Sequence, residues 1–271
     1  MATPDYYKRQ YFPNQRAQIV SEETLNEMIK FADDNYSKDD TSSRFEVAYS
    51  YYAIADYLEA AGAFQRASKY YHFAAHQLRS VENFKNAAGA YFAGGRAAEV
   101  AALAKGEPAN RRIENLDWAV RSYARAKTCF EDIGDAEEAS EAYVAEQDAR
   151  RKLAKARGNR SSWLALELLR VTTKYGQKWG RLLITMAGFS ALYASTYETL
   201  HRLHQLGPGI EGHWNALSAI YYPLAVALSL DAGAFSDSTI VAQWIGLSNV
   251  VLAWMFLGIA GALVARRVKE R

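Results

Sequence analysis

The residues best placed to act on ions lie beside the apolar stretches in the last third of the chain. Asp231 directly follows a long uncharged stretch, and a ring of carboxylates in a pore attracts cations. The histidines His201, His204 and His213 lie near the same stretch and can titrate between pH 5 and 8, which would let them sense external pH. Simpler interpretations stay open: Asp231 is a solvated loop carboxylate near the outer surface, paired with Arg202, and the histidines have no specific role.

The rest of the sequence gives little indication of an enzyme. His72 and His76 are four residues apart, a spacing at which one helix face can hold a metal ion, but no third ligand stands at a suitable distance. There is no nucleotide-binding loop and no nucleophile–base pair, so we expect no enzyme, no cofactor and no bound metal. The net charge of +2 does not favour nucleic acid as a partner, and the single cysteine, Cys129, excludes an intrachain disulfide.

Three uncharged stretches must position these residues: Leu182–Tyr197, Trp214–Leu230 and Ile240–Ala265. Lys and Arg are concentrated before the first stretch and after the last, and Arg202 is the only one between them. Because basic residues mark the cytoplasmic side of a membrane, both termini are expected in the cytoplasm and the number of crossings is even. One stretch therefore enters and leaves on the same side of the cell (inner) membrane.

The lengths of the stretches indicate which one is re-entrant. The last stretch would be about 39 Å long as a helix, enough to cross the hydrocarbon core with a tilt. The first is shorter, but Trp179 and the basic Arg181 can lie at the interface. The middle stretch contains Pro223 and fits half the membrane thickness. We expect spans at about residues 180–200 and 240–265 and a re-entrant segment at about 214–232.

This order of elements resembles the two-transmembrane potassium-channel pore domain, over about residues 180–267. The segment AIYYPLAVALSLDAGA (219–234) aligns without gaps on that family's pore helix and filter. The segment FLGIAGALVARR (256–267) is similar to the end of its inner helix. The resemblance implies a homo-oligomer, with four subunits around a central axis, and a permeant cation.

The candidate filter departs from the family pattern of Thr-x-Gly-Tyr-Gly. It consists of Ser229, Leu230, Asp231, Ala232 and Gly233. Only the final glycine is kept, and the other residues do not easily adopt the backbone angles of a carbonyl-lined filter. We therefore expect a filter that is not potassium-selective. Three outcomes stay open: a non-selective pore, conduction of something else, or a non-conducting pore fold that anchors and oligomerises the chain.

Two further groups of residues are candidates for a role in the membrane part. Small residues on the last span allow close helix packing or bending: Gly258, Gly261 and Ala262. Basic residues before and within the first span can couple it to the preceding domain or bind lipid headgroups: Arg170, Lys174, Lys178 and Arg181. The simpler interpretation of the basic group is a topology signal alone.

The first part of the chain has the composition of a helical domain. From Ser21 to Lys155 it is rich in Ala, Glu, Arg, Tyr and Leu, and Pro108 is its only proline. Breaks between helices are expected at five places: Ser37–Ser43, Ala61–Ala63, Ser80–Asn83, Lys105–Ala109 and Ile133–Asp135. Helices of about 15–25 residues fit between these breaks.

Three of the helices begin with a similar motif, in which a short turn precedes a small residue and a tyrosine four positions later. The pairs are Ala67 and Tyr71, Ala87 and Tyr91, and Ala139 and Tyr143. Residues four apart share one helix face, so the tyrosine can fill the groove that the small residue opens. The motif resembles the SNAP-type variant of tetratricopeptide repeats, over roughly residues 45–155. The resemblance implies an array that binds a protein or peptide, or assembles with itself.

The sequence thus predicts an all-α protein with three parts. These are a cytoplasmic helical-repeat domain (1–160), a basic juxtamembrane helix (161–178) and a membrane domain (179–271) with two transmembrane helices and a re-entrant pore helix. The first functional hypothesis is an oligomeric ion channel or channel-like pore coupled to its repeat domain. The alternative is a non-conducting, membrane-anchored scaffold or accessory subunit that binds a protein partner through the repeats.

Overall fold

The computed structural model describes residues 22–36, 40–176, 179–206, 218, 225–226 and 239–269. Every regular element within these residues is an α-helix, which confirms the predicted all-α class. The chain divides into two compact units, Met1–Arg170 and Val171–Arg271, and each is described by itself. The predicted domain boundaries after residues 160 and 178 stay predictions.

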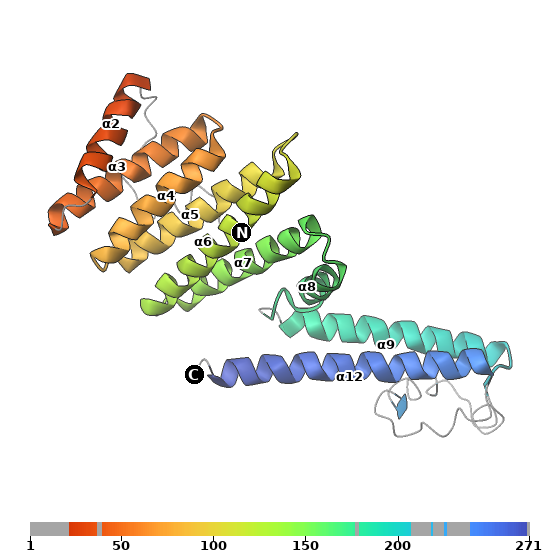
Figure 1. The fold of residues 1–271 in the computed structure, drawn as a ribbon. Coiled ribbons are helices and arrows are strands. Elements are labelled where there is room, and N and C mark those ends of the chain that lie inside the picture. Colours follow the sequence, from red (N-terminus) through yellow and green to blue (C-terminus); the bar gives the residue numbers. More distant parts are fainter. Residues whose placement is uncertain are drawn as a thin grey trace. The chain divides into compact units, whose positions relative to one another are not determined.

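The first unit is built around a stack of helices. Its elements are α2 (Glu22–Asn35), α3 (Thr41–Ala60), α4 (Phe64–Ser80), α5 (Phe84–Leu103), α6 (Ala109–Asp132), α7 (Ala136–Ala156) and the start of α8 (Arg160–Thr173). Helices α2–α7 follow one another in space in chain order, and each packs mainly on its neighbours in sequence (Figure 1). We call α2–α7 the array. Each of the five predicted breaks coincides with a junction between consecutive helices, and three of them overlap a helix end by one to three residues.

One type of three-residue turn closes four helices of this unit. The middle residue of each turn has a positive φ: Gly62, Glu82, Gly134 and Gly158. The next amide then donates to the carbonyl five residues back, as Asp135 N does to Phe130 O at 2.9 Å, which is the Schellman geometry. In three turns the last residue also caps the following helix through its side chain: Asn83, Asp135 and Asn159. Turns of this kind lead directly into the next helix, and in three of the four cases that helix packs back on the one before it: α3 with α4, α4 with α5, and α6 with α7.

The repeated small residue and tyrosine lie where the helices pack. Ala67 and Ala87 are fully buried, and Tyr71 and Tyr91 are buried beside them. Close approach is also required at a glycine of α5, since a Cβ on Gly95 would lie 2.9 Å from the Tyr123 ring. At these two pairs the motif marks packed faces of the array, whereas in the third pair Ala139 is buried and Tyr143 is only half-buried.

The helix α8 is shorter than the predicted basic helix over residues 161–178. It ends at Thr173, because the next three residues, Lys174, Tyr175 and Gly176, all have positive φ. The Thr173 hydroxyl accepts a hydrogen bond from the Gly176 amide at 2.9 Å and closes the turn. The helix does not continue through this turn towards residue 178.

The described helices of the second unit are α9 (Trp179–Arg202) and α12 (Ile240–Lys269). They run side by side in opposite directions (Figure 1). Tyr193 Oη lies 2.9 Å from Ser248 Oγ, and the rings of Phe189 and Phe256 are 5.4 Å apart. We call α9 and α12 the hairpin helices.

One helix of the described residues is long and apolar enough to cross a membrane, Ile240–Gly261 within α12. It corresponds to the predicted span at 240–265. The helix α9 covers the predicted span at 180–200, but a second crossing is not established by its composition and stays a proposal. The predicted re-entrant segment at 214–232 lies outside the described residues, apart from three isolated positions.

Candidate functional site

The array carries a buried polar contact that joins three of its helices. The Oη atom of Tyr71 on α4 lies 2.7 Å from Glu59 Oε2 and 2.5 Å from Asp56 Oδ1, both on α3. Arg96 on α5 donates to the other oxygen of Glu59 at 2.7 Å. The single hydroxyl proton of Tyr71 serves one carboxylate at a time, and Arg96 compensates part of their negative charge.

The same contact recurs one helix pair further along. Tyr123 on α6 donates to Glu99 Oε2 on α5 at 3.1 Å. Lys152 on α7 forms an ion pair with the other oxygen of Glu99. In both cases a glutamate on one helix binds the tyrosine of the next helix and a cation of the helix after that. We call these two groups the inter-repeat nodes.

The nodes hold helices together, and their charged side chains are partly exposed to water. Burial raises the pKa of Tyr71 and Tyr123 well above 10, so both hydroxyls stay protonated and act as donors. The glutamate and cation side chains are only partly buried. The nodes therefore tie alternate helices, α3 to α5 and α5 to α7, at a surface that water reaches.

A histidine on α4 packs into a second cluster of the array. His72 Nε2 accepts a hydrogen bond from Arg125 Nη1 at 2.7 Å, and its ring contacts Trp118 and Tyr91. Because this nitrogen faces a cation, it is not available as a metal ligand with His76 in this conformation. Among the described residues no three His, Cys, Asp or Glu side chains are grouped to hold a metal.

The His72 cluster predicts a specific loss of stability in acid. Burial and the neighbouring Arg125 lower the pKa of His72 from 6.5 to about 4. The unfolded chain therefore binds a proton at His72 as the pH falls below 6.5, whereas the folded chain binds it only near pH 4. This contribution to stability is present above pH 6.5 and is lost between pH 6.5 and 4. Urea unfolding of His72→Gln in that range should show a weaker decline with acid than the unsubstituted chain.

His76 provides the matched control for this experiment, because it lies one turn later on α4 and is exposed. His76→Gln should keep most of the acid-dependent decline, because burial and Arg125 lower the pKa of His72 more than His76 does. Equal slopes for the unsubstituted chain and His72→Gln would contradict a neutral His72 in the folded chain at these pH values.

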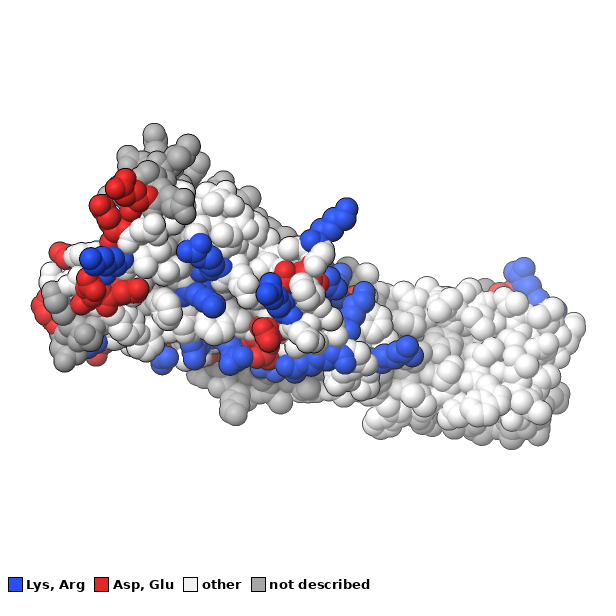
Figure 2. All heavy atoms as spheres, turned by 45° about the horizontal axis from the view of Figure 1, so that its top comes forward, with Lys and Arg blue, Asp and Glu red and all other residues white. Residues whose placement is uncertain are grey.

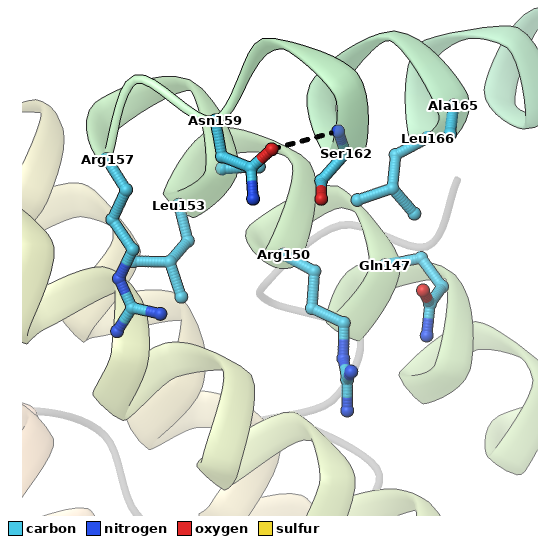
Figure 3. A pocket seen from close by; sticks show the side chains of 9 residues that line it. Gln147, Arg150, Leu153, Arg157, Asn159, Ser162, Ala165 and Leu166 are labelled. Carbon is cyan, nitrogen blue, oxygen red and sulfur yellow. Dashed lines mark hydrogen bonds between the residues drawn. The ribbon is translucent and has the colours of Figure 1, made fainter.

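A groove of about 410 Å³ lies between α7 and α8 (Figure 3). Arg150 and Arg157 line it from α7 and its last turn, and Asn159 and Ser162 from the start of α8. The Ser162 amide donates to Asn159 Oδ1 at 3.1 Å, which fixes the α8 N-terminus at its edge. The side chains that line this groove include no Asp or Glu, so its polar rim is basic.

The hairpin helices expose an apolar surface. Large apolar side chains recur along one side of α12 at helical spacing and are at least half exposed: Ile240, Trp244, Leu247, Val251, Trp254 and Leu257. The opposite side contains Ala242, Asn249 and Phe256, which are buried in the second unit. Figure 2 shows this part of the chain, on the right, as an almost uncharged surface, whereas acidic and basic side chains alternate over the array.

The predicted pore residues are only partly placed by the structure. The candidate filter, Ser229, Leu230, Asp231, Ala232 and Gly233, lies outside the described residues. Gly258 and Gly261 lie on α12, and a Cβ at either position would meet no atom within 4 Å. Ala262 follows on the same helix. Arg202, the predicted partner of Asp231, donates to Glu198 one turn earlier on α9, at 3.0 Å.

The predicted juxtamembrane residues do not form one helical face. Arg170 lies near the end of α8 and is 3.5 Å from Glu167. Lys174 follows in the turn with φ 49°, and Arg181 is exposed on the first turn of α9. Lys178 lies outside the described residues. The turn at residues 174–176 separates Arg170 from Arg181.

Reasoning from sequence missed both inter-repeat nodes. A spacing of 40 residues relates Glu59 to Glu99, and each precedes a buried tyrosine on the next helix. That spacing is visible in the sequence, but the cations differ in type and lie 37 and 53 residues from their glutamates.

We found no match to the chain among protein-family models, curated proteins or solved structures.

Proposed function

We propose that the protein is a membrane-anchored scaffold, held in the bilayer by the hairpin helices, whose array binds a protein partner on the cytoplasmic side. The observation that carries the proposal is the exposed apolar side of α12. Its two tryptophans and four aliphatic residues form a continuous stripe that water solvates poorly. Lipid chains can cover such a stripe without any change in the helix.

The register of the hairpin helices supports a topology with both ends on one side. The contacts of Phe189 with Phe256 and of Tyr193 with Ser248 run in opposite directions along the two helices. Continuing that register brings the start of α9, with Arg181, within about one or two turns of Arg266 on α12. Basic residues at both ends would then favour the cytoplasm for the array and the C-terminus.

The array offers an aromatic surface for a partner. Tyr36 and Phe73 are each about 40% exposed, and their rings are 6.3 Å apart. Tyr51 and Tyr70 pack behind them. Aromatic side chains in such partly exposed clusters are enriched in the centres of protein interfaces. We infer that this cluster is the first place to look for the partner.

Cysteine labelling tests the topology. Cys129 is buried, so the unsubstituted chain is the labelling blank. Leu103→Cys on the array and His204→Cys beyond α9 both place an exposed thiol on described residues. In sealed vesicles of one orientation, a membrane-impermeant maleimide should label only one of the two. Labelling of both in intact vesicles would contradict the two-crossing topology.

Photo-crosslinking tests the partner surface. A photoreactive residue replacing Phe73 should form a crosslink to a second protein in native membranes. The matched control is the same replacement at Val100 on α5, which is 39% exposed and lies outside the aromatic cluster. Equal crosslinking at both positions would contradict a specific role for the cluster.

The second candidate function is the oligomeric, non-potassium-selective pore. It is favoured by Gly258 and Gly261, which leave open space on α12 where a helix of another copy can pack closely. Four copies would then surround an axis lined by the residues around Asp231. Single-channel recording from proteoliposomes, with Asp231→Asn beside the unsubstituted chain, separates the two functions. A change of ion preference supports the pore, and no conductance from a folded oligomer supports the scaffold.

A further inference from the structure

The junction of α7 and α8 concentrates basic side chains around two adjoining grooves. The second groove, of about 320 Å³, shares Asn159 with the first and is lined by Lys155, Gly158, Asn159, Arg160, Trp163 and Leu164. Neither groove has an acidic residue in its lining. Together they bring four cations to one junction: Arg150, Lys155, Arg157 and Arg160.

Two of these cations have no ion pair among the described residues. Arg150 binds Glu146 and Arg157 lies 3.3 Å from Asp117, whereas Lys155 and Arg160 are exposed and form no ion pair with the described part of the chain. Both of the unpaired cations line the second groove. That groove therefore offers positive charge to a ligand from outside the chain.

Apolar side chains of α8 lie beside these cations. Leu164 and Val171 are each 58% exposed, and their separation of seven residues puts them on one side of the helix. Trp163 lines the second groove, and its Nε1 has no hydrogen-bond acceptor among the described residues. Exposed leucine and valine, an indole and flanking Lys and Arg are the composition of helices that lie in a membrane interface.

The chain length keeps α8 near the bilayer if α9 enters it. Five residues separate Thr173 from Trp179, which span at most about 20 Å when extended. The helix itself is about 21 Å long, so it can lie along the headgroup region from its end to its start. Its apolar side and the basic junction would then reach the lipid together.

We propose that the α7–α8 junction binds anionic phospholipid headgroups, with Lys155 and Arg160 at the phosphates and Leu164 in the acyl boundary. This proposal rests on the membrane anchoring proposed above. It assigns the lipid contact to residues 155–171 rather than to the predicted group at 170–181. Two cations without an ion pair among the described residues, and a groove whose lining has no acidic residue, give the charge complementarity that selects an anionic lipid.

The test uses the full chain in vesicles with the array facing outward. A nitrobenzoxadiazole label is attached to Leu164→Cys, or to Leu103→Cys as the matched control, since both leucines are 58% exposed. In vesicles containing phosphatidylglycerol, a nitroxide-labelled lipid should quench the label at 164, and dithionite in the water should reach it slowly. The label at 103 should stay open to dithionite in all vesicles.

Charge variants then test the headgroup contact. The double variant Lys155→Gln and Arg160→Gln removes both cations of the second groove. For the label at position 164, the ratio of the lipid-contacting to the water-exposed population should fall about fivefold for each cation removed. The control pair, Lys105→Gln with Arg111→Gln, removes two exposed cations beside another turn and should have no effect. Soluble glycerol phosphate should not displace the label from the lipid. If it does displace the label, the ligand is a free phosphate compound and the proposal of a lipid ligand is overturned.

Failure of anchoring and failure of this proposal give different results. A chain that leaves the membrane in alkaline carbonate is not anchored, which contradicts the proposed function. A chain that stays in the membrane, but whose label at 164 is as open to dithionite as the label at 103, overturns the junction contact alone. Equal quenching in neutral and anionic vesicles would likewise overturn the assignment to anionic headgroups.

Discussion

Replacing Tyr71 with alanine should lower the free energy of unfolding of the array by about 3–5 kcal/mol. Tyr71 on α4 is fully buried against α3 and α5, so its removal leaves a cavity that the helix backbones cannot close. The substitution also removes the hydroxyl that lies between Asp56 and Glu59. Hydrogen–deuterium exchange of α3–α5 peptides in the full chain should show the loss as faster exchange.

Two further variants separate the cavity from the lost hydroxyl. Tyr71→Phe keeps the ring and should cost about 1–3 kcal/mol, because two carboxylates lose a donor. Tyr143→Ala removes the tyrosine at the same position of the motif, where it is only half-buried, and should cost less than Tyr71→Ala. A Tyr71→Ala variant with unchanged exchange in α3–α5 would refute the inter-repeat node as a source of stability.

A single arginine in place of Val251 should largely prevent membrane integration. Val251 lies midway along Ile240–Gly261 and is 59% exposed, so the new side chain would face lipid. A charge at the centre of a spanning helix costs about 2.5–3.5 kcal/mol on insertion scales. Sedimentation of the membrane fraction after alkaline carbonate treatment should find the variant mostly in the supernatant.

The same substitution on the array is the control. Val100→Arg on α5 places an arginine at another partly exposed valine, where water solvates it, and membrane integration should not change. Val251→Leu should also integrate normally. If Val251→Arg stays in the membrane as firmly as Val251→Leu, α12 is covered by protein rather than lipid and the anchoring proposal fails.

The helices of the array could be predicted because their boundaries depend on local sequence. Gly62 and Gly134 adopt positive φ at little cost, and Asn83 and Asp135 cap the helices that follow. The end of α8 was not predictable in this way. Lys174 and Tyr175 have positive φ although neither residue type favours it, so the turn depends on packing that the sequence pattern does not reveal.

The candidate sites were less predictable than the fold. The groove between α7 and α8 depends on the angle between two helices, which no residue spacing encodes. The ion pair of Arg202 with Glu198 has the four-residue spacing of a helix and could have been predicted once α9 was extended to residue 202. The pore interpretation depended on residues 229–233 and on a family resemblance, and it stays a proposal.

The inter-repeat nodes have a mechanical consequence. The ion pairs Glu59–Arg96 and Glu99–Lys152 join alternate helices of the array, whereas the apolar core holds consecutive helices together. Salt weakens the partly exposed ion pairs and leaves the apolar contacts intact. As the ionic strength rises, the links from α3 to α5 and from α5 to α7 should therefore loosen while the array stays folded.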